Sequence, residues 1–74
     1  MEEKLKGIFI KVLGSYDSIK KQQEYERWDS FAHMELVSEV ESRFGVALTV
    51  DEVVSIESAQ DILRIISSKN GKNH

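Results

Sequence analysis

A serine hydroxyl stands at a predicted helix start, because Asp29 and Ser30 end a polar stretch and an apolar periodic segment follows them. A side-chain oxygen at such a position can accept a hydrogen bond from an unpaired backbone N–H group. The same hydroxyl, exposed after a loop, is accessible to a modifying enzyme, and a negatively charged modification there is favoured by the helix dipole. Capping and covalent modification are therefore two interpretations of Ser30.

The residues after Ser30 favour modification. At about 100° per residue, one side of the helix collects a core stripe; its members are His33, Leu36, Val37, Val40 and Phe44. Phe31 falls nearly opposite that stripe, where an aromatic side chain ringed by carboxylates is typical of a partner surface rather than of packing. The predicted docking residues around Ser30 are Asp29, Phe31, Met34, Glu35, Glu39 and Glu41.

Two other residues invite a functional interpretation that their surroundings do not favour. Asp17-Ser18 repeats the Asp-Ser pair, but Lys20 and Lys21 follow it instead of an apolar helical stripe, which indicates a turn or helix-end serine. His33 lies on the core side of the helix and has no carboxylate at helical spacing except Asp29, so a buried or half-buried structural histidine is favoured over a catalytic one. No residue is predicted to be catalytic, and no ligand spacing indicates a metal site.

The elements that must position Ser30 are helical, because the chain has no proline, few glycines and a 3.6-residue apolar period. We expect a first helix over about 2–16, a long connecting loop over 17–28 anchored by Ile19 and Tyr25, and a second helix over 30–44 that stops at Gly45. Capping patterns at Thr49 and Ser58 predict a short third helix to about residue 55 and a last helix. We expect residues 67–74 to form a flexible tail. The fold class is therefore all-α, a small four-helix bundle of three main helices and one short helix in a single domain, 1–74.

Composition excludes several classes of function. The 74 residues allow a small core, contain no cysteine, and include no stretch that reads as a signal peptide or a membrane span, so the cytoplasm is the default location. Residues 29–61 carry eight acids against one base, whereas the two ends of the chain are basic. An acidic middle repels nucleic acid and attracts basic protein patches, which disfavours a helix-turn-helix nucleic acid binder.

These residues carry a resemblance to a family. Asp29-Ser30-Phe31, followed by Glu35-Leu36-Val37 and Glu41-Ser42-Arg43-Phe44-Gly45-Val46, resembles the acyl carrier proteins. In that family an Asp-Ser-Leu motif opens the second helix and its serine carries 4′-phosphopantetheine. The resemblance covers about 28–66 and, more loosely, the first helix. Phe31 replaces the usual leucine, and the glycine often found two residues before the aspartate is absent.

The resemblance implies that Ser30 receives 4′-phosphopantetheine from coenzyme A and that the thiol of this arm holds acyl groups as thioesters. The implied partners are a phosphopantetheinyl transferase and acyl-loading ligase or synthase enzymes with basic docking patches. The chain itself would be a monomer and no enzyme, serving a dedicated lipid, polysaccharide or natural-product pathway. The alternative is an unmodified acidic helical adaptor that keeps a carrier-like fold.

Overall fold

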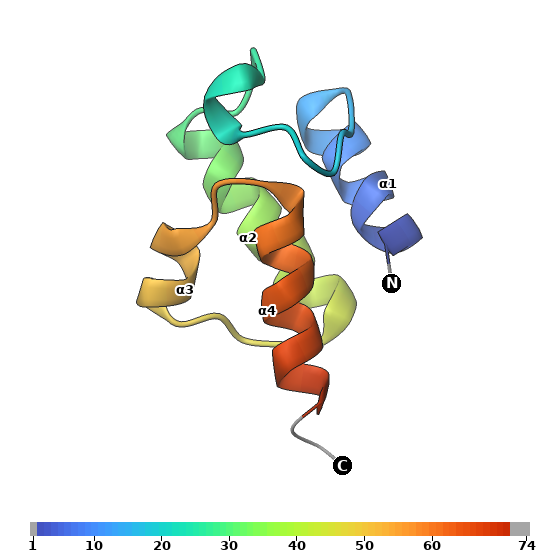
Figure 1. Ribbon diagram of the computed structural model, residues 1–74, viewed down its shortest axis with the longest axis vertical. Helices are drawn as coiled ribbons and strands as arrows, with labels where there is room; N and C mark the ends of the chain where they lie inside the picture. The colour runs from blue at the N-terminus through green and yellow to red at the C-terminus, as the bar shows by residue number, and fades with distance from the viewer. Residues whose placement is uncertain (1, 72–74) are drawn as a thin grey trace.

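The computed structural model describes residues 2–71, and the side chains of residues 2–69. Within this range the chain forms four α-helices, α1 (Glu2–Leu13), α2 (Ser30–Phe44), α3 (Val50–Ser55) and α4 (Ala59–Gly71), and a 3₁₀ helix, η1 (Gln22–Glu24). Helix α1 contacts both α2 and α4, while the short α3 lies on the other side of the molecule (Figure 1). The predicted all-α bundle of three main helices and one short helix is confirmed.

One apolar core holds these elements together. Its buried side chains come from one face each of α1, α2 and α4, from two aromatic residues of the connection before α2, and from Ile56 between α3 and α4. The members are Leu5, Ile8, Phe9, Leu13, Tyr25, Trp28, Ala32, Leu36, Val37, Val40, Ile56, Ala59, Ile62 and Ile66. Because α3 contributes no buried residue, other contacts must hold it in place.

Two aromatic side chains anchor the connection between α1 and α2. The ring centroid of Phe9 lies 5.4 Å from that of Trp28 and 6.0 Å from that of Tyr25. The prediction that Ile19 also anchors the connection is wrong, because its side chain is 70% exposed. The carboxylate of Asp17 accepts a hydrogen bond from the Ile19 N–H, and the resulting tight turn leaves the Ile19 side chain in solvent. Trp28 anchors the loop directly before the helix that begins at Ser30.

Helix α1 ends at Leu13, three residues before the predicted end. Gly14 adopts a left-handed conformation with φ 85°, and its N–H donates to the carbonyl of Ile10 at 2.9 Å. This conformation suits glycine and stops the helix. Tyr16 fits the helical period but packs edge-on against Phe9 from the connection, with ring centroids 5.5 Å apart.

Helix α4 continues into the segment that we predicted to be a flexible tail. The helix reaches Gly71, so the prediction is wrong for 67–71, and 72–74 lie outside the described residues. Lys69 pairs with Glu52 of α3 at 2.9 Å, a tertiary contact that supports this polar turn. Glu52 also accepts from the Thr49 N–H, and these two partners lower the pKa of its carboxyl.

The starts and ends of α2 and α3 agree with the prediction. Gly45 ends α2 with φ 65°, and its N–H donates to the carbonyl of Glu41. Helix α3 begins with the predicted capping box: the Thr49 hydroxyl accepts from the Glu52 N–H at 3.1 Å, and the Glu52 carboxylate accepts from the Thr49 N–H at 2.9 Å. Capping residues that are near in sequence therefore suffice to predict where α2 and α3 begin and where α2 ends.

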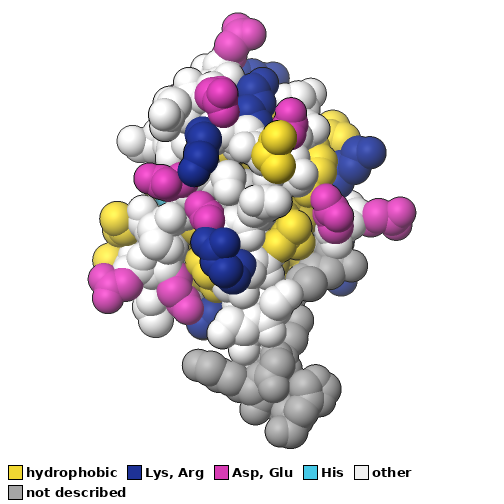
Figure 2. Space-filling model, in the orientation of Figure 1, with side chains coloured by type: hydrophobic (Ala, Val, Ile, Leu, Met, Phe, Trp, Pro, Cys, Tyr) yellow, Lys and Arg dark blue, Asp and Glu magenta, His cyan; other side chains and the backbone are white. Residues whose placement is uncertain are grey.

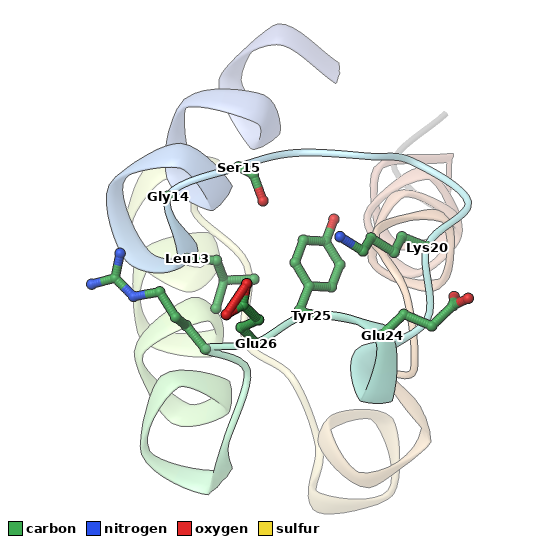
Figure 3. A pocket seen from close by; sticks show the side chains of 8 residues that line it. Leu13, Gly14, Ser15, Lys20, Glu24, Tyr25 and Glu26 are labelled. Carbon is green, nitrogen blue, oxygen red and sulfur yellow. The ribbon is translucent and has the colours of Figure 1, made fainter.

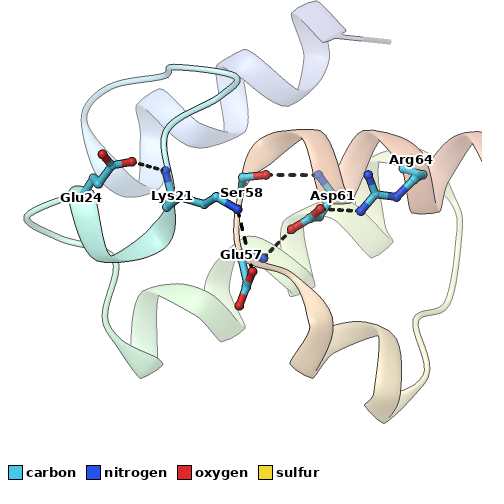
Figure 4. A network of polar contacts seen from close by, with 6 residues as sticks. All are labelled: Lys21, Glu24, Glu57, Ser58, Asp61 and Arg64. Carbon is cyan, nitrogen blue, oxygen red and sulfur yellow. Dashed lines mark hydrogen bonds and ion pairs between the residues drawn. The ribbon is translucent and has the colours of Figure 1, made fainter.

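A polar network joins the connection to the start of α4 (Figure 4). The Gln22 N–H donates to the Glu57 carbonyl at 2.7 Å, and the Lys21 ammonium lies 4.0 Å from the Glu57 carboxylate. The Asp61 carboxylate accepts from the Glu57 N–H at 2.8 Å and pairs with Arg64. Burial of Asp61 opposes its ionisation, but the Glu57 N–H and Arg64 outweigh it and lower the pKa of this carboxyl. The network fixes η1 beside α4.

Candidate functional site

Ser30 is the first helical residue of α2 and is exposed. Asp29, in an extended conformation, caps the helix: its carboxylate oxygen accepts from the Ala32 N–H at 2.8 Å. Because Asp29 provides the cap, the hydroxyl of Ser30 is not needed for it, and this hydroxyl forms no hydrogen bond with any described residue. The hydroxyl is therefore open to an incoming reagent.

Two hollows flank the start of α2. The first, of about 340 Å³, includes Ser30 itself, and its lining residues are Gln22, Ser30, His33, Met34, Val53, Val54 and Ile56. The second, of about 410 Å³, lies toward α1, and its lining residues are Val12, Glu26, Arg27, Asp29, Phe31, Ala32 and Glu35. The first hollow has no ionised side chain in its lining, whereas the second has several. Ser30 therefore borders an uncharged space between α2 and α3.

The hollow beside Ser30 has an apolar neighbour along the same pair of helices. A space of about 440 Å³ shares Met34, Val53 and Val54 with it and also contacts Val37 and Leu48. Val54 is 73% exposed, so the outer wall of this groove is formed by side chains that solvent already reaches. We call the two hollows together the α2–α3 groove.

The two apolar residues predicted to dock a partner are exposed. Phe31 is 74% exposed and Met34 is 55% exposed, on α2 within one turn of Ser30. Phe31 borders the hollow toward α1, whereas Met34 borders the α2–α3 groove. The predicted exposure of Phe31 is confirmed, and the two side chains lie on opposite flanks of Ser30.

The predicted docking acids differ in their surroundings. Glu35 is exposed and forms no ion pair with a described residue. Glu39 contacts Lys11 at 2.9 Å and Arg43 at 3.0 Å, and these hydrogen bonds lower the pKa of its carboxyl. Asp29 is exposed but caps α2. Of these three, Glu35 has the least compensated charge.

Glu41 has a role within the fold. Its carboxylate accepts from the backbone N–H of Leu48 at 2.8 Å and so holds the loop between α2 and α3. Sequence reasoning could not assign this contact, because the loop conformation that brings Leu48 back to α2 is not encoded by any local spacing.

The face that carries α4 shows acidic and basic side chains interspersed (Figure 2).

His33 is half-buried and occupies a structural position, as predicted. Its two ring nitrogens contact the Trp28 indole and the Val53 carbonyl, so it joins three segments around the groove. Sequence reasoning missed Trp28, Gln22 and Val53 as residues that shape the site. The only sequence signal for Trp28 was its place directly before the Asp-Ser pair.

The rival serine and a further hollow lie elsewhere. Ser18 is in a turn, as predicted, and not at the start of a helix. A hollow of about 260 Å³ opens beside the end of α1, with Lys20, Glu24 and Tyr25 along its lining (Figure 3). The Tyr25 hydroxyl donates to the Asp17 carbonyl at 3.0 Å and accepts from its N–H at 2.9 Å. These contacts make Tyr25 part of the fold.

Residues 2–71 contain neither a cluster of metal-binding side chains nor a membrane-spanning helix. No group of three or more His, Asp or Glu side chains is placed to hold a metal ion. None of the helices in this range combines the length and the apolar character needed to cross a membrane.

Comparison with known proteins identifies a family. The model of the phosphopantetheine attachment site family matches residues 3–66, which is most of the chain. Neither the curated proteins nor the solved structures give a significant match. Members of the matched family carry covalently attached 4′-phosphopantetheine. The chain therefore belongs to the phosphopantetheine-binding carrier family.

Proposed function

We propose that the chain is an acyl carrier protein in which the Ser30 hydroxyl is the attachment point for 4′-phosphopantetheine. The observation that supports this most is the exposed, unbonded hydroxyl on the first residue of α2, with the cap supplied by Asp29 instead. The attached arm supplies a thiol that holds an acyl group as a thioester. The chain has no cysteine, so no side chain of its own can provide that thiol.

The residues around Ser30 fit the group. In the transfer from coenzyme A, Ser30 Oγ forms a bond to the phosphorus that bears pantetheine, and the bond from that phosphorus to adenosine 3′,5′-bisphosphate breaks. The hydroxyl proton passes to a base of the transferase. The new phosphodiester is negatively charged, and the start of α2 favours a negative charge by about 0.3–1 kcal/mol. The chain contributes the hydroxyl and the helix start, and the transferase contributes the catalysis.

Partner enzymes are proposed to grip the start of α2. Phe31 and Met34 offer exposed apolar area on either side of Ser30, and Glu35 offers an uncompensated carboxylate. Glu39 contributes less, because Lys11 and Arg43 already neutralise it. Glu41 contributes through the shape of the α2–α3 loop. The partners are a phosphopantetheinyl transferase and acyl-loading ligases or synthases with basic patches; the monomeric state, the cytoplasmic location and a dedicated pathway remain predictions.

The test is modification in vitro. The protein is incubated with a broad-specificity phosphopantetheinyl transferase, magnesium and coenzyme A, and the intact mass is followed. A single arm should be added to the wild-type chain and to Ser18→Ala, and none to Ser30→Ala. Modification of Ser30→Ala, or its loss in Ser18→Ala, would overturn the site. A wild-type chain that stays unmodified would favour the alternative, an adaptor with a carrier-like fold.

A further inference from the structure

Both ring nitrogens of His33 are engaged, and their partners determine where the proton lies. The Trp28 indole N–H donates to His33 Nδ1 at 2.9 Å, and His33 Nε2 lies 2.8 Å from the Val53 carbonyl oxygen. An indole nitrogen can only donate and a carbonyl can only accept. His33 must therefore be neutral, with Nδ1 free to accept and the proton on Nε2.

The two hydrogen bonds join three segments at the site. Trp28 belongs to the connection and lies two residues before Ser30, while its indole also packs on Phe9 and stacks on the His33 ring at 5.9 Å between centroids and 25° between planes. Val53 belongs to α3, which has no buried side chain of its own. The imidazole therefore links the residues leading into Ser30 with a helix whose side chains are at most partly buried.

The same imidazole lines the α2–α3 groove together with Ser30, Met34 and Val53. A shift of α3 or of Trp28 would change the width of the groove next to the hydroxyl. We propose that neutral His33 is a positioning residue: through Trp28 and Val53 it fixes Ser30 and α3 relative to one another, and so sets how the hydroxyl is presented to the modifying enzyme. This inference rests on the proposed function of Ser30.

The arrangement makes presentation of Ser30 sensitive to pH. Protonation of Nδ1 would set an N–H against the Trp28 N–H, so the cationic ring cannot keep both bonds. The side chains lining this hollow with His33 carry no charge. Along the three segments, the carboxylates of Glu24, Asp29 and Glu52 accept from the backbone N–H groups of Lys21, Ala32 and Thr49. Glu35, Asp51 and Arg27, on the same segments, are exposed.

The linkage can be measured without any modification, because Trp28 is the only tryptophan. The emission of the unmodified wild-type chain should change when acid protonates the imidazole. In His33→Asn the amide oxygen can still accept from Trp28, and in His33→Gln the amide N–H can still donate to Val53. Neither variant should show the wild-type transition. If both keep it, the transition does not come from His33 and the linkage is wrong.

The effect on Ser30 is measured as the transferase rate on wild-type and variant chains at each pH, so that the pH dependence of the transferase cancels in the ratio. At about pH 8, His33→Leu, which loses both bonds, should be modified about 5- to 150-fold more slowly, the range expected for two lost net hydrogen bonds. His33→Asn and His33→Gln should each recover part of the rate. Under acidic conditions in which the emission transition is complete, the ratio of the wild-type rate to the His33→Leu rate should approach one.

A control variant that weakens the core separates positioning from general loosening of the fold. Ile66→Val weakens the core from α4, where the side chain is fully buried, and should be modified at the wild-type rate. Slow modification of Ile66→Val to the same extent as His33→Leu, or a wild-type rate in His33→Leu, would overturn the positioning role. If no chain is modified while the emission transition is present, the function of Ser30 fails and the linkage stands.

Discussion

Replacing Phe31 with serine should separate docking from folding. Phe31 is 74% exposed, so only about a quarter of its side chain is covered. For a large aromatic side chain of about 200 Å² this is about 50 Å², which corresponds to about 1 kcal/mol at ~25 cal/mol per Å². We therefore expect Phe31→Ser to lower the free energy of unfolding by no more than about 1 kcal/mol. For comparison, Leu36→Ala at a buried position of the same helix should cost about 2–5 kcal/mol.

The functional cost should be larger. An aromatic anchor at the centre of an interface contributes about 1–3 kcal/mol of binding, so kcat/KM for the phosphopantetheinyl transferase should fall roughly 5- to 150-fold in Phe31→Ser. The rate is measured from intact mass against time, and stability from urea unfolding. Ile19→Ser is the matched control, because Ile19 is 70% exposed and lies in the turn of the connection. Equal rates for the two variants, or a Phe31→Ser chain that does not fold, would refute the docking argument.

Three further variants test the charges of the site and of the fold. Glu35→Lys should slow modification about tenfold at low ionic strength and much less at high salt, with the unfolding free energy changed by less than about 0.5 kcal/mol; a salt-independent effect would contradict an electrostatic role. Asp29→Ala removes the cap on the Ala32 N–H and should cost about 1 kcal/mol in thermal or urea unfolding, whereas an unchanged stability would mean that another group caps α2. Asp61→Asn should cost about 1 kcal/mol at neutral pH. Because the folded pKa of Asp61 is lowered, its stabilisation is present above the unfolded value of about 3.9 and is lost as the pH falls through the folded pKa, so urea unfolding should show the two chains converging in acid.

The parts of the fold that could be predicted from the sequence are the helix ends marked by capping residues or by glycine. Asp29 and Gly45 bound α2, and Thr49 with Glu52 starts α3, because capping needs only residues that are near in sequence. The end of α1 was overestimated because Tyr16 satisfies the helical period, although Gly14 had already turned the chain. The apolar period of the sequence continues to Tyr16, although the helix itself stops at Gly14, where the backbone becomes left-handed.

The features that the sequence did not reveal depend on tertiary contacts. The polar end of α4 was read as a tail because nothing in its sequence indicates the pairing of Lys69 with Glu52, seventeen positions away. Glu39 was predicted only as a docking residue, and its ion pair with Lys11 was not foreseen because Lys11 comes from another helix. His33 was placed on the core side, yet its bond to Trp28 required the conformation of the connection. The exposure of the Ser30 hydroxyl could be predicted, because it follows from the position of Ser30 at the start of the helix, next to the capping residue Asp29.

The most direct test of the central claim is the position of the modification in the protein isolated from cells that make it. Fragmentation of the peptide that contains residues 28–43 locates the added group by mass. We expect 4′-phosphopantetheine on Ser30 and on neither Ser38 nor Ser42. An arm on any other residue would contradict the site, and a chain that stays unmodified even in the presence of an active transferase would contradict the carrier function.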